Sequence, residues 1–395
     1  MSSRPVSSRR LTAVISALIF LDMMTWLAAI PLIPVWEDEF ALSDDQAGVV
    51  LAIYSLTVLL FAIPTGYLAD RVGARRLTLI GAGLFVVAAP AIAFVGSFEA
   101  LLAVRLFQGV CSAVTWSAGL AWLTAAVEPG YRVRGLAVAN ASATVATIGG
   151  PLFGGPVVAL IGIEAAFIGL GALVLLVIAW ALVEPGGAAG PRALQERQGP
   201  FVALVYARRP GALQMSFVAI AFVSLMMAAL QLLSPLYFDD EGFSSSAIGW
   251  VFTVGSILSV LAILAVGRYG SRVDGPRVLV ALTLVCSGLI LLLLVPAGVW
   301  WYATGLVVVI GVAAPIFTIA YAICAEGARQ AGIGEGAAFG MLNAVWAVGA
   351  VIAPVVSGIV AEGGVSWIAY ALVALLALGA AALLGRSRQR LAAAS

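Results

Sequence analysis

The sequence predicts an all-α membrane protein with twelve transmembrane helices in two pseudo-symmetric six-helix halves. Three observations lead to this prediction: the apolar composition, the distribution of charges, and a repeat along the chain. Apolar residues make up 63% of the chain and charged residues only 10%. Because a soluble domain this apolar could not cover its surface with polar groups, its expected solvent is lipid.

Apolar runs long enough to span a bilayer occur twelve times. A bilayer core about 30 Å thick needs roughly 20 apolar residues per helix. Helices are the expected form, because lipid offers no partner to unpaired backbone amides. The first run follows three arginines, as a signal peptide would, but it is too long for one and is interpreted as an uncleaved helix. The runs cover residues 11–35, 46–66, 77–95, 100–125, 136–160, 164–183, 213–236, 246–267, 278–296, 299–324, 336–360 and 364–385.

The charges predict the orientation of these helices. Every basic residue is arginine, and the chain contains no histidine. If the N-terminus is cytoplasmic, every arginine except Arg105 falls in a cytoplasmic segment, whereas the opposite loops carry only acids such as Glu37 and Asp239. This pattern follows the positive-inside rule. We therefore expect a multi-pass protein of the cell inner (plasma) membrane with both termini cytoplasmic, and no nucleic-acid partner.

A repeat divides the chain on either side of its longest polar segment, residues 183–211. A shift of 201 residues aligns Pro34 with Pro235 and Arg71 with Arg272, and a shift of 203 aligns Asn140 with Asn343. An offset held across four helices is hard to obtain from shared membrane-helix composition alone. The predicted domains are an N-terminal six-helix bundle (1–183), a cytoplasmic linker (184–212) and a C-terminal six-helix bundle (213–395). Such parallel repeats are typical of transporters with a midplane binding site.

The loop between the second and third helices reads "GYLADRVGARR". Its glycines permit a tight turn and close helix approach. The loop resembles the signature loop of the major facilitator superfamily, G-x-L-a-D-r-x-G-r-k/r, and the alternative is an ordinary basic loop. The resemblance implies the fold of that superfamily and a cytoplasmic gate formed by Gly66, Asp70, Arg71, Gly73, Arg75 and Arg76.

The fourth helix carries a polar stripe. Arg105 lies about 9 Å into the span, and Gln108, Ser112 and Trp116 follow it on the same helical face. The stretch resembles the superfamily motif R-x-x-q-G, in which the arginine is linked to proton coupling. The alternative is that Arg105 extends to the outer headgroups. The expected role of Arg105 is therefore proton coupling.

The fifth helix contains "GGPLFGG". It resembles the G-P-x-x-G-G core of a motif associated with exporters of the superfamily, although Ala146 replaces the upstream glycine. Small residues let helices pack closely and proline bends them, so a packing role is an equal alternative. The residues of this motif are Gly150, Pro151, Gly154 and Gly155.

The first helix places Asp22 near the bilayer midplane, about 16 Å beyond Leu11. Its counterpart in the repeat is Val223, so only the N-terminal half carries this charge. Ionisable residues within membrane spans are functional by default. We expect Asp22 to exchange a proton for a cationic substrate, with Trp26 one turn away as a cation–π partner. The alternative is a structural acid that accepts hydrogen bonds from a neighbouring helix.

The pattern D-x(8)-P-x-x-P around Asp22 resembles helix one of the vesicular monoamine transporters and their bacterial drug:proton antiporter relatives. In those proteins the acid contacts the substrate amine. One departure is Asn343, which stands where the vesicular transporters have an acid. Substrate binding is assigned to Asp22 and Trp26 and, with less support, to Tyr54, Gln108, Trp116, Asn140, Gln231, Tyr321, Asn343 and Trp346.

The expected function is a proton-coupled secondary transporter, an exporter (antiporter) of lipophilic cationic or neutral compounds that works by alternating access. The alternative is a carrier of a small metabolite or organic anion with Arg105 as its substrate partner. An enzyme is not expected, since the chain has no nucleotide loop and no metal-ligand cluster. We expect no cofactor or metal. The expected partners are a small-molecule substrate, the proton and membrane lipid, with the protein as a monomer.

Overall fold

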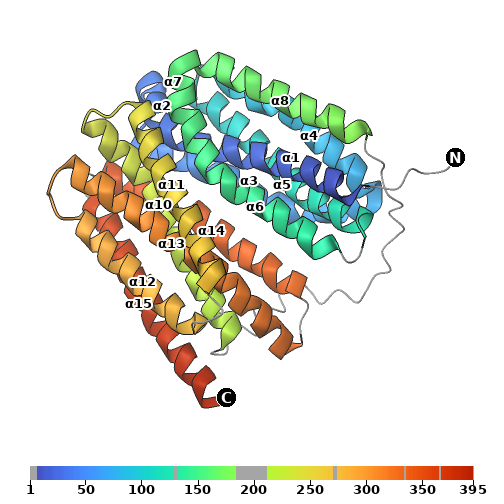
Figure 1. The fold of residues 1–395 in the computed structure, drawn as a ribbon. Coiled ribbons are helices and arrows are strands. Elements are labelled where there is room, and N and C mark those ends of the chain that lie inside the picture. The colour runs from blue at the N-terminus through green and yellow to red at the C-terminus, as the bar shows by residue number, and fades with distance from the viewer. Residues whose placement is uncertain are drawn as a thin grey trace. The chain divides into compact units, whose positions relative to one another are not determined.

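The computed structural model describes residues 7–128, 131–183, 211–269, 274–332, 335–363 and 366–394. Within these ranges the regular structure is entirely helical (Figure 1). Eleven helices in them are long and apolar enough to cross a membrane, and a twelfth apolar stretch, Tyr370–Arg386, is slightly shorter. The chain is therefore an all-helical membrane protein, as its composition predicts.

The chain divides into two compact units. The first unit comprises Met1–Leu42, Val49–Gln195 and Phe243–Thr253. The second unit comprises Ser43–Gly48, Glu196–Gly242 and Val254–Ser395. The domain boundaries 1–183, 184–212 and 213–395 remain a prediction from the sequence repeat. The predicted linker lies outside the described residues except at its last two positions.

In the first unit, α1 packs along α6, and α4 packs beside α5 and α8 (Figure 1). The elements are α1 (Ser8–Ala28), η1 (Ile30–Leu32), α2 (Ile33–Phe40), α3 (Asp44–Val72), α4 (Ala74–Ala91), η2 (Ile92–Phe94), α5 (Phe98–Ala126), α6 (Arg132–Leu152), η4 (Phe153–Val157), α7 (Val158–Ile161) and α8 (Ile163–Val183). The first five residues of α3 belong to the second unit.

Prolines account for the irregular turns in two spans of this unit. Pro31 and Pro34 have no backbone N–H to donate, and the 3₁₀ turn η1 separates α1 from α2 at this point. Next to η1, η4 is a π-helical turn that contains Pro156 and follows Pro151. The predicted bend of the fifth span therefore takes the form of a π turn, a common cause of helix distortion.

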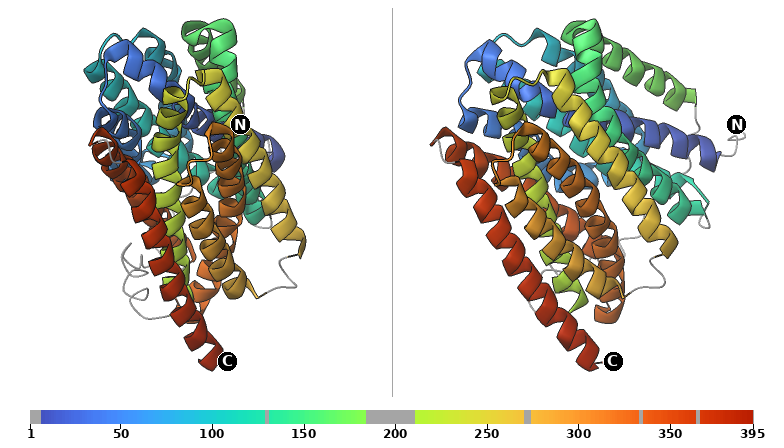
Figure 2. Two further views of the ribbon diagram at one scale, coloured as in Figure 1. Left: turned by 90° about the vertical axis from the view of Figure 1, so that its left-hand side faces the viewer. Right: turned by 60° about the vertical axis from the view of Figure 1, so that its left-hand side comes forward.

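In the second unit, α10 packs against α13, α14 and α15, and α12 packs against α13 and α15. In Figure 2, α15 is the long red helix that ends at the C-terminus. The elements are α10 (Ala212–Asp240), α11 (Ser245–Tyr269), α12 (Gly275–Leu293), α13 (Val299–Ala331), α14 (Glu335–Glu362) and α15 (Ser366–Ala394). The first part of α11, up to Thr253, belongs to the first unit.

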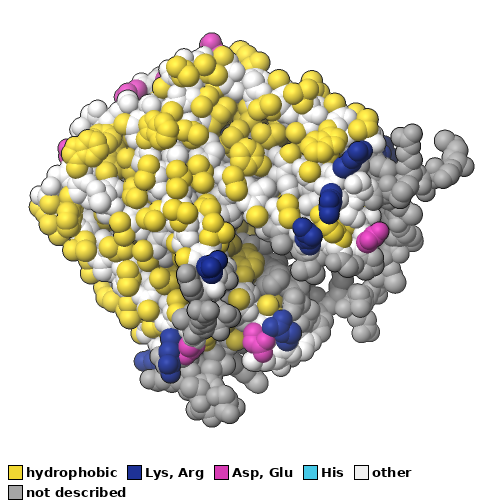
Figure 3. Space-filling view, viewed as in Figure 1, with side chains coloured by type: hydrophobic (Ala, Val, Ile, Leu, Met, Phe, Trp, Pro, Cys, Tyr) yellow, Lys and Arg dark blue, Asp and Glu magenta, His cyan; other side chains and the backbone are white. Residues whose placement is uncertain are grey.

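The outer faces of the helices are apolar. Leu160 is 83% exposed and Leu176 is 66% exposed, although both are large hydrophobic residues. Figure 3 shows one face of the molecule almost covered by apolar side chains, with basic side chains gathered toward its right-hand and lower margins. Because contiguous apolar surface of this kind is unfavourable in water, it fits a lipid environment.

Candidate transport site

Asp22 of α1 lies in the interior of the first unit, where its residue is only 1% exposed. The hydroxyl of Tyr54, on α3, donates to Oδ1 of Asp22 at 3.2 Å. Two side chains of α5 donate to Oδ2: the Ser112 hydroxyl at 2.7 Å and the Trp116 indole Nε1 at 2.9 Å. Three uncharged donors from two neighbouring helices therefore hold the carboxyl group.

The two oxygens of Asp22 differ in what their partners can do. An indole N–H can only donate, so Trp116 keeps Oδ2 in an acceptor role. The Tyr54 hydroxyl can either donate or accept. A proton on Oδ1 can thus be donated to Tyr54 after this hydroxyl turns, while Trp116 keeps its bond to Oδ2. The site can hold both the charged and the protonated carboxyl with little rearrangement.

Arg105 lies on the same face of α5 and is fully buried. Its Nη1 donates to Oε1 of Gln108 at 3.1 Å, and its Nε donates to the Val50 carbonyl at 3.5 Å. Gln108 in turn donates to the Ala88 carbonyl at 3.0 Å. The Arg105 side chain is therefore enclosed by α3, α4 and α5, whereas an arginine extended toward the headgroups would be exposed.

Tyr54 contacts both Asp22 and Arg105. Its ring centroid lies 5.0 Å from the Arg105 guanidinium carbon, and its hydroxyl bonds Asp22. Trp26 of α1 stacks on the same ring at 6.0 Å with an interplanar angle of 20°. Two residues of the polar stripe predicted on the fourth span, Ser112 and Trp116, thus bond Asp22 directly. Arg105 is linked to Asp22 through Tyr54, and Gln108 bonds Arg105.

The connection through Tyr54 could not be found from the sequence. Tyr54 appears there only as one of several aromatic candidates, 32 residues from its acid partner. The carbonyls of Val50 and Ala88, which accept from Arg105 and Gln108, carry no residue-specific signal at all. The helical spacing on α5, by contrast, is a local pattern that the sequence displays.

The remaining substrate-binding candidates lie elsewhere. Asn140 of α6 is exposed and donates to the Leu136 carbonyl of its own helix at 2.9 Å. In the second unit, the Tyr321 hydroxyl on α13 donates to Oδ1 of Asn343 on α14. Two further candidates of that unit, Gln231 of α10 and Trp346 of α14, are half-buried. Tyr321 and Asn343 are therefore joined directly across two helices.

The second unit also contains a buried hydroxyl cluster that the sequence did not indicate. The Tyr302 hydroxyl hydrogen-bonds Ser234 at 2.8 Å and also hydrogen-bonds Tyr370. These residues come from α13, α10 and α15, and no spacing in the sequence relates them. Among the described residues, no group of three or more His, Cys, Asp or Glu is placed to hold a metal ion.

The predicted gate motif covers the end of α3 and the start of α4. Gly73 between them has φ of 99°, a conformation that favours glycine. Arg75 donates to the Leu182 carbonyl at the end of α8 at 3.0 Å and lies over the Trp122 ring. Arg71 and Arg76 are exposed, Gly66 has open space beside its Cα, and the side chain of Asp70 lies outside the described residues.

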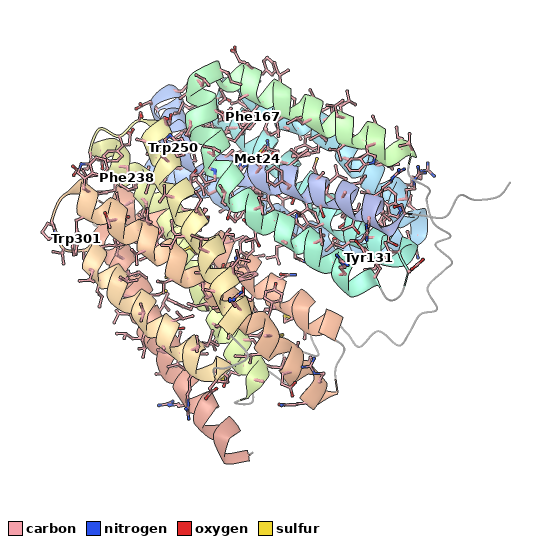
Figure 4. The ribbon with its side chains drawn as sticks, viewed as in Figure 1. Met24, Tyr131, Phe167, Phe238, Trp250 and Trp301 are labelled. Carbon is pink, nitrogen blue, oxygen red and sulfur yellow. The ribbon has the colours of Figure 1, made fainter. Side chains whose placement is uncertain are left out.

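The helix-five motif lies against α1. A Cβ atom on Gly150 would come within 2.4 Å of Leu27 Cβ, and one on Gly154 would come within 2.0 Å of the Ala28 carbonyl oxygen. A Cβ atom on Gly155 would come within 2.6 Å of the Ser245 carbonyl oxygen in the same unit. Met24, at this contact, and Phe167 of α8 are labelled in Figure 4. These glycines therefore have a packing role, whatever further role the motif has.

The arrangement can be compared with known proteins. The sequence matches the model of the Major Facilitator Superfamily at residues 15–336 and 242–394, which together cover most of the chain. The chain belongs to the Major Facilitator Superfamily. It is therefore a multi-pass membrane protein of a family of transporters rather than of enzymes, as the signature loop and the repeat predict.

Solved structures share the superfamily fold. A mutant form of the nucleoside transporter NupG has a TM-score of 0.75 and 17% sequence identity, with 95% of this chain and 99% of that chain covered. A bacterial homologue of the human lysosomal transporter Spinster, in an inward-facing and occupied conformation, also has a TM-score of 0.75, with 16% identity and 98% of each chain covered. At such identities the likeness shows the fold alone.

Curated relatives match parts of the chain. The multidrug resistance protein Stp of Mycobacterium tuberculosis is 34% identical over 162 residues, which are 40% of this chain and 30% of that protein. The tetracenomycin C resistance and export protein of Streptomyces glaucescens is 32% identical over 126 residues, 31% of this chain and 23% of that protein. The MFS-type transporter ppzB of Metarhizium rileyi is 30% identical over 154 residues, 38% of this chain and 32% of that protein. The chain thus matches about a third or less of the length of these relatives.

Proposed function

We propose that this transporter is a proton-coupled exporter, an antiporter of lipophilic cationic or neutral compounds, in the cell inner membrane with both termini cytoplasmic. The observation that carries the proposal is Asp22, a carboxyl group buried in the first unit and held by three uncharged donors. A carboxylate at this depth in a membrane is costly unless a proton or a cation neutralises it. Alternating neutralisation by the two is the chemistry of antiport.

In the proposed cycle, Asp22 takes a proton from the outside, and the loss of its charge weakens binding of a cation there. The proton later leaves to the cytoplasm, and the restored carboxylate favours the next cation. Trp26 and Trp116, which are half-buried next to Asp22, offer aromatic faces to a cation. Arg105 acts on Asp22 through Tyr54, because the same ring contacts the guanidinium and presents its hydroxyl to the acid.

Two observations support export as the direction. The name of one relative describes multidrug resistance, and that of another describes tetracenomycin C resistance and export. The sequence from Gly150 to Gly155 also resembles the motif associated with exporters of the superfamily. Tyr321 and Asn343 in the second unit are proposed as further substrate contacts, since a phenol and an amide can both bind polar groups of a ligand.

An anion carrier is the second candidate, and one atom favours it. Nη2 of Arg105 is buried and has no hydrogen-bond partner among the described residues, so it is available to an anionic group. Against this candidate, Arg105 is fully buried and its other polar groups already bind Gln108 and Val50. Such a carrier would not depend on protonation of Asp22.

The test is Asp22→Asn in proteoliposomes with an imposed pH difference. Asparagine can direct its amide N–H toward Tyr54 and its oxygen toward Ser112 and Trp116, so it imitates the protonated state and should fold. We expect accumulation driven by the pH difference to be lost and binding of a cationic substrate to weaken, because the variant carries no charge at this position in either state. Asp38→Asn, the same change at an exposed acid of α2, is the control. Undiminished pH-driven accumulation by Asp22→Asn would falsify the proposal, and for an anionic substrate it would favour the second candidate.

A further inference from the structure

An apolar groove of about 480 Å³ runs along the outer face of the first unit between α1, α6 and α8. Its walls include Phe20 of α1, Val145 of α6, and Leu176 and Trp180 of α8. Asp22 faces α3 and α5, and Phe20 lies on another side of α1, so the groove is separate from the transport site. Figure 1 shows the three helices adjacent to one another, with α1 between α6 and α8. The volume is within the range of about 300–1,000 Å³ for small-molecule sites.

One polar side chain of the groove lacks a partner. Ser16 is 9% exposed, and its buried hydroxyl has no hydrogen-bond partner among the described residues. A buried donor left unsatisfied is unfavourable, so a ligand atom that accepts from it would be favoured. The groove thus combines apolar walls with one lining serine whose hydroxyl has no hydrogen-bond partner among the described residues.

The charges at one end of the groove are basic. Arg9 and Arg10 are exposed in the first turn of α1, and each lies seven residues before a groove residue, Ser16 and Ala17 respectively. Seven residues are two helical turns, so each arginine is on the same face as its groove residue and about 10 Å closer to the cytoplasmic end. Trp180 lies three residues from the end of α8, where tryptophan is common at membrane interfaces. Figure 3 shows basic side chains near the ends of these helices, beside the apolar face.

We propose that this groove binds an acyl chain of an anionic glycerophospholipid of the cytoplasmic leaflet. The chain occupies the apolar walls, Arg9 and Arg10 bind the phosphate, and the Ser16 hydroxyl donates to an ester oxygen below the headgroup. The charge of the arginines selects an anionic over a zwitterionic headgroup. A transported lipophilic cation would instead be repelled by these arginines. The inference depends on the cytoplasmic position of the N-terminus but not on the identity of the transported compound.

The test compares lipid binding by the purified full chain. Phosphatidylglycerol and phosphatidylcholine with the same acyl chains are titrated in detergent, and bound lipid is counted by native mass spectrometry. We expect tighter binding of phosphatidylglycerol by the wild type. Basic residues near a membrane surface are worth about 1 kcal/mol each, so Arg9→Gln with Arg10→Gln should weaken this binding about 30-fold. Arg386→Gln, at an exposed arginine of α15, should leave it unchanged.

A second variant tests the groove itself. Ala17→Phe fills it and should abolish the preferred phosphatidylglycerol site, whereas Val87→Phe, at a 63% exposed position of α4, should not. Thermal unfolding shows whether each variant is folded, and the arginine pair remains informative if Ala17→Phe is not. Equal binding of the two lipids by the wild type, no effect of a folded Ala17→Phe, or displacement of the lipid by a transported cation would each overturn the proposal. Asp22→Asn should bind lipid normally, so a failure of the proposed function is distinguishable.

Discussion

At single residues, the site keeps Asp22 and Arg105 buried in the same bundle, and Tyr54 contacts both of them. Buried charges are tolerated when their polar atoms are satisfied. Asp22 accepts three hydrogen bonds, and Arg105 donates two and contacts an aromatic ring. Because Tyr54 takes part in both environments, a change in protonation of Asp22 is felt by Arg105 through a single side chain.

Tyr54→Phe tests this residue. The variant keeps the ring below Arg105 and beside Trp26 but removes the donor to Oδ1 of Asp22. A hydrogen bond to a charged group contributes about 1.5–3 kcal/mol, so the carboxylate state forms less readily and pH-driven transport should slow about tenfold or more. Initial rates in proteoliposomes measure the effect.

The matched control is Tyr302→Phe, which removes a buried hydroxyl of the second unit that bonds Ser234 and Tyr370. It should affect stability without a specific loss of proton coupling. If both variants lose transport equally, or if Tyr54→Phe transports normally, Tyr54 does not connect proton binding to transport.

At the scale of elements, the contact of α6 and η4 with α1 depends on glycine. Gly150 of α6 and Gly154 of the π turn η4 approach the α1 backbone closely at Leu27 and Ala28. Membrane helices associate through van der Waals packing, which small residues allow at short range. The helix-five motif therefore helps to position α1, the helix that carries Asp22.

Gly154→Ala should destabilise the protein. Its Cβ would lie 2.0 Å from the Ala28 carbonyl oxygen, which is backbone and cannot move aside alone. Overpacking costs typically about 1–3 kcal/mol, so the thermal unfolding midpoint in detergent should fall. Gly169→Ala on α8 meets no atom within 4 Å and should leave the midpoint unchanged or slightly raised. Equal midpoints for the two variants would contradict the role of Gly154 in this contact.

At the scale of the whole molecule, the number of crossings determines where the C-terminus lies. Eleven described helices meet the length and hydropathy of a span, and the apolar part of α15 is shorter. That part ends at Arg386, Arg388 and Arg390 follow it, and the positive-inside rule keeps such residues cytoplasmic. With a twelfth crossing by α15, the N-terminus and the C-terminus lie on the same side of the membrane.

Reporter fusions test this topology. If the C-terminus is cytoplasmic, as we propose, fluorescent protein joined after residue 395 should fluoresce and alkaline phosphatase at that point should be inactive. A truncation after Gly363, before α15, should reverse both results. An active phosphatase on the full-length chain would mean that α15 does not cross the membrane.

The sequence by itself determined the membrane class, the spans, the superfamily and the polar stripe on α5. Each of these is a property of composition or of helical spacing, which is local along the chain. The depth of Asp22 in the membrane stays a prediction from its distance to the start of an apolar run. Only the tertiary structure decided that Tyr54 connects Asp22 to Arg105, that Gly154 touches α1, and that Ser16 lies in the floor of a groove. These contacts join residues on different helices, and no local pattern encodes which faces of twelve similar apolar helices will meet.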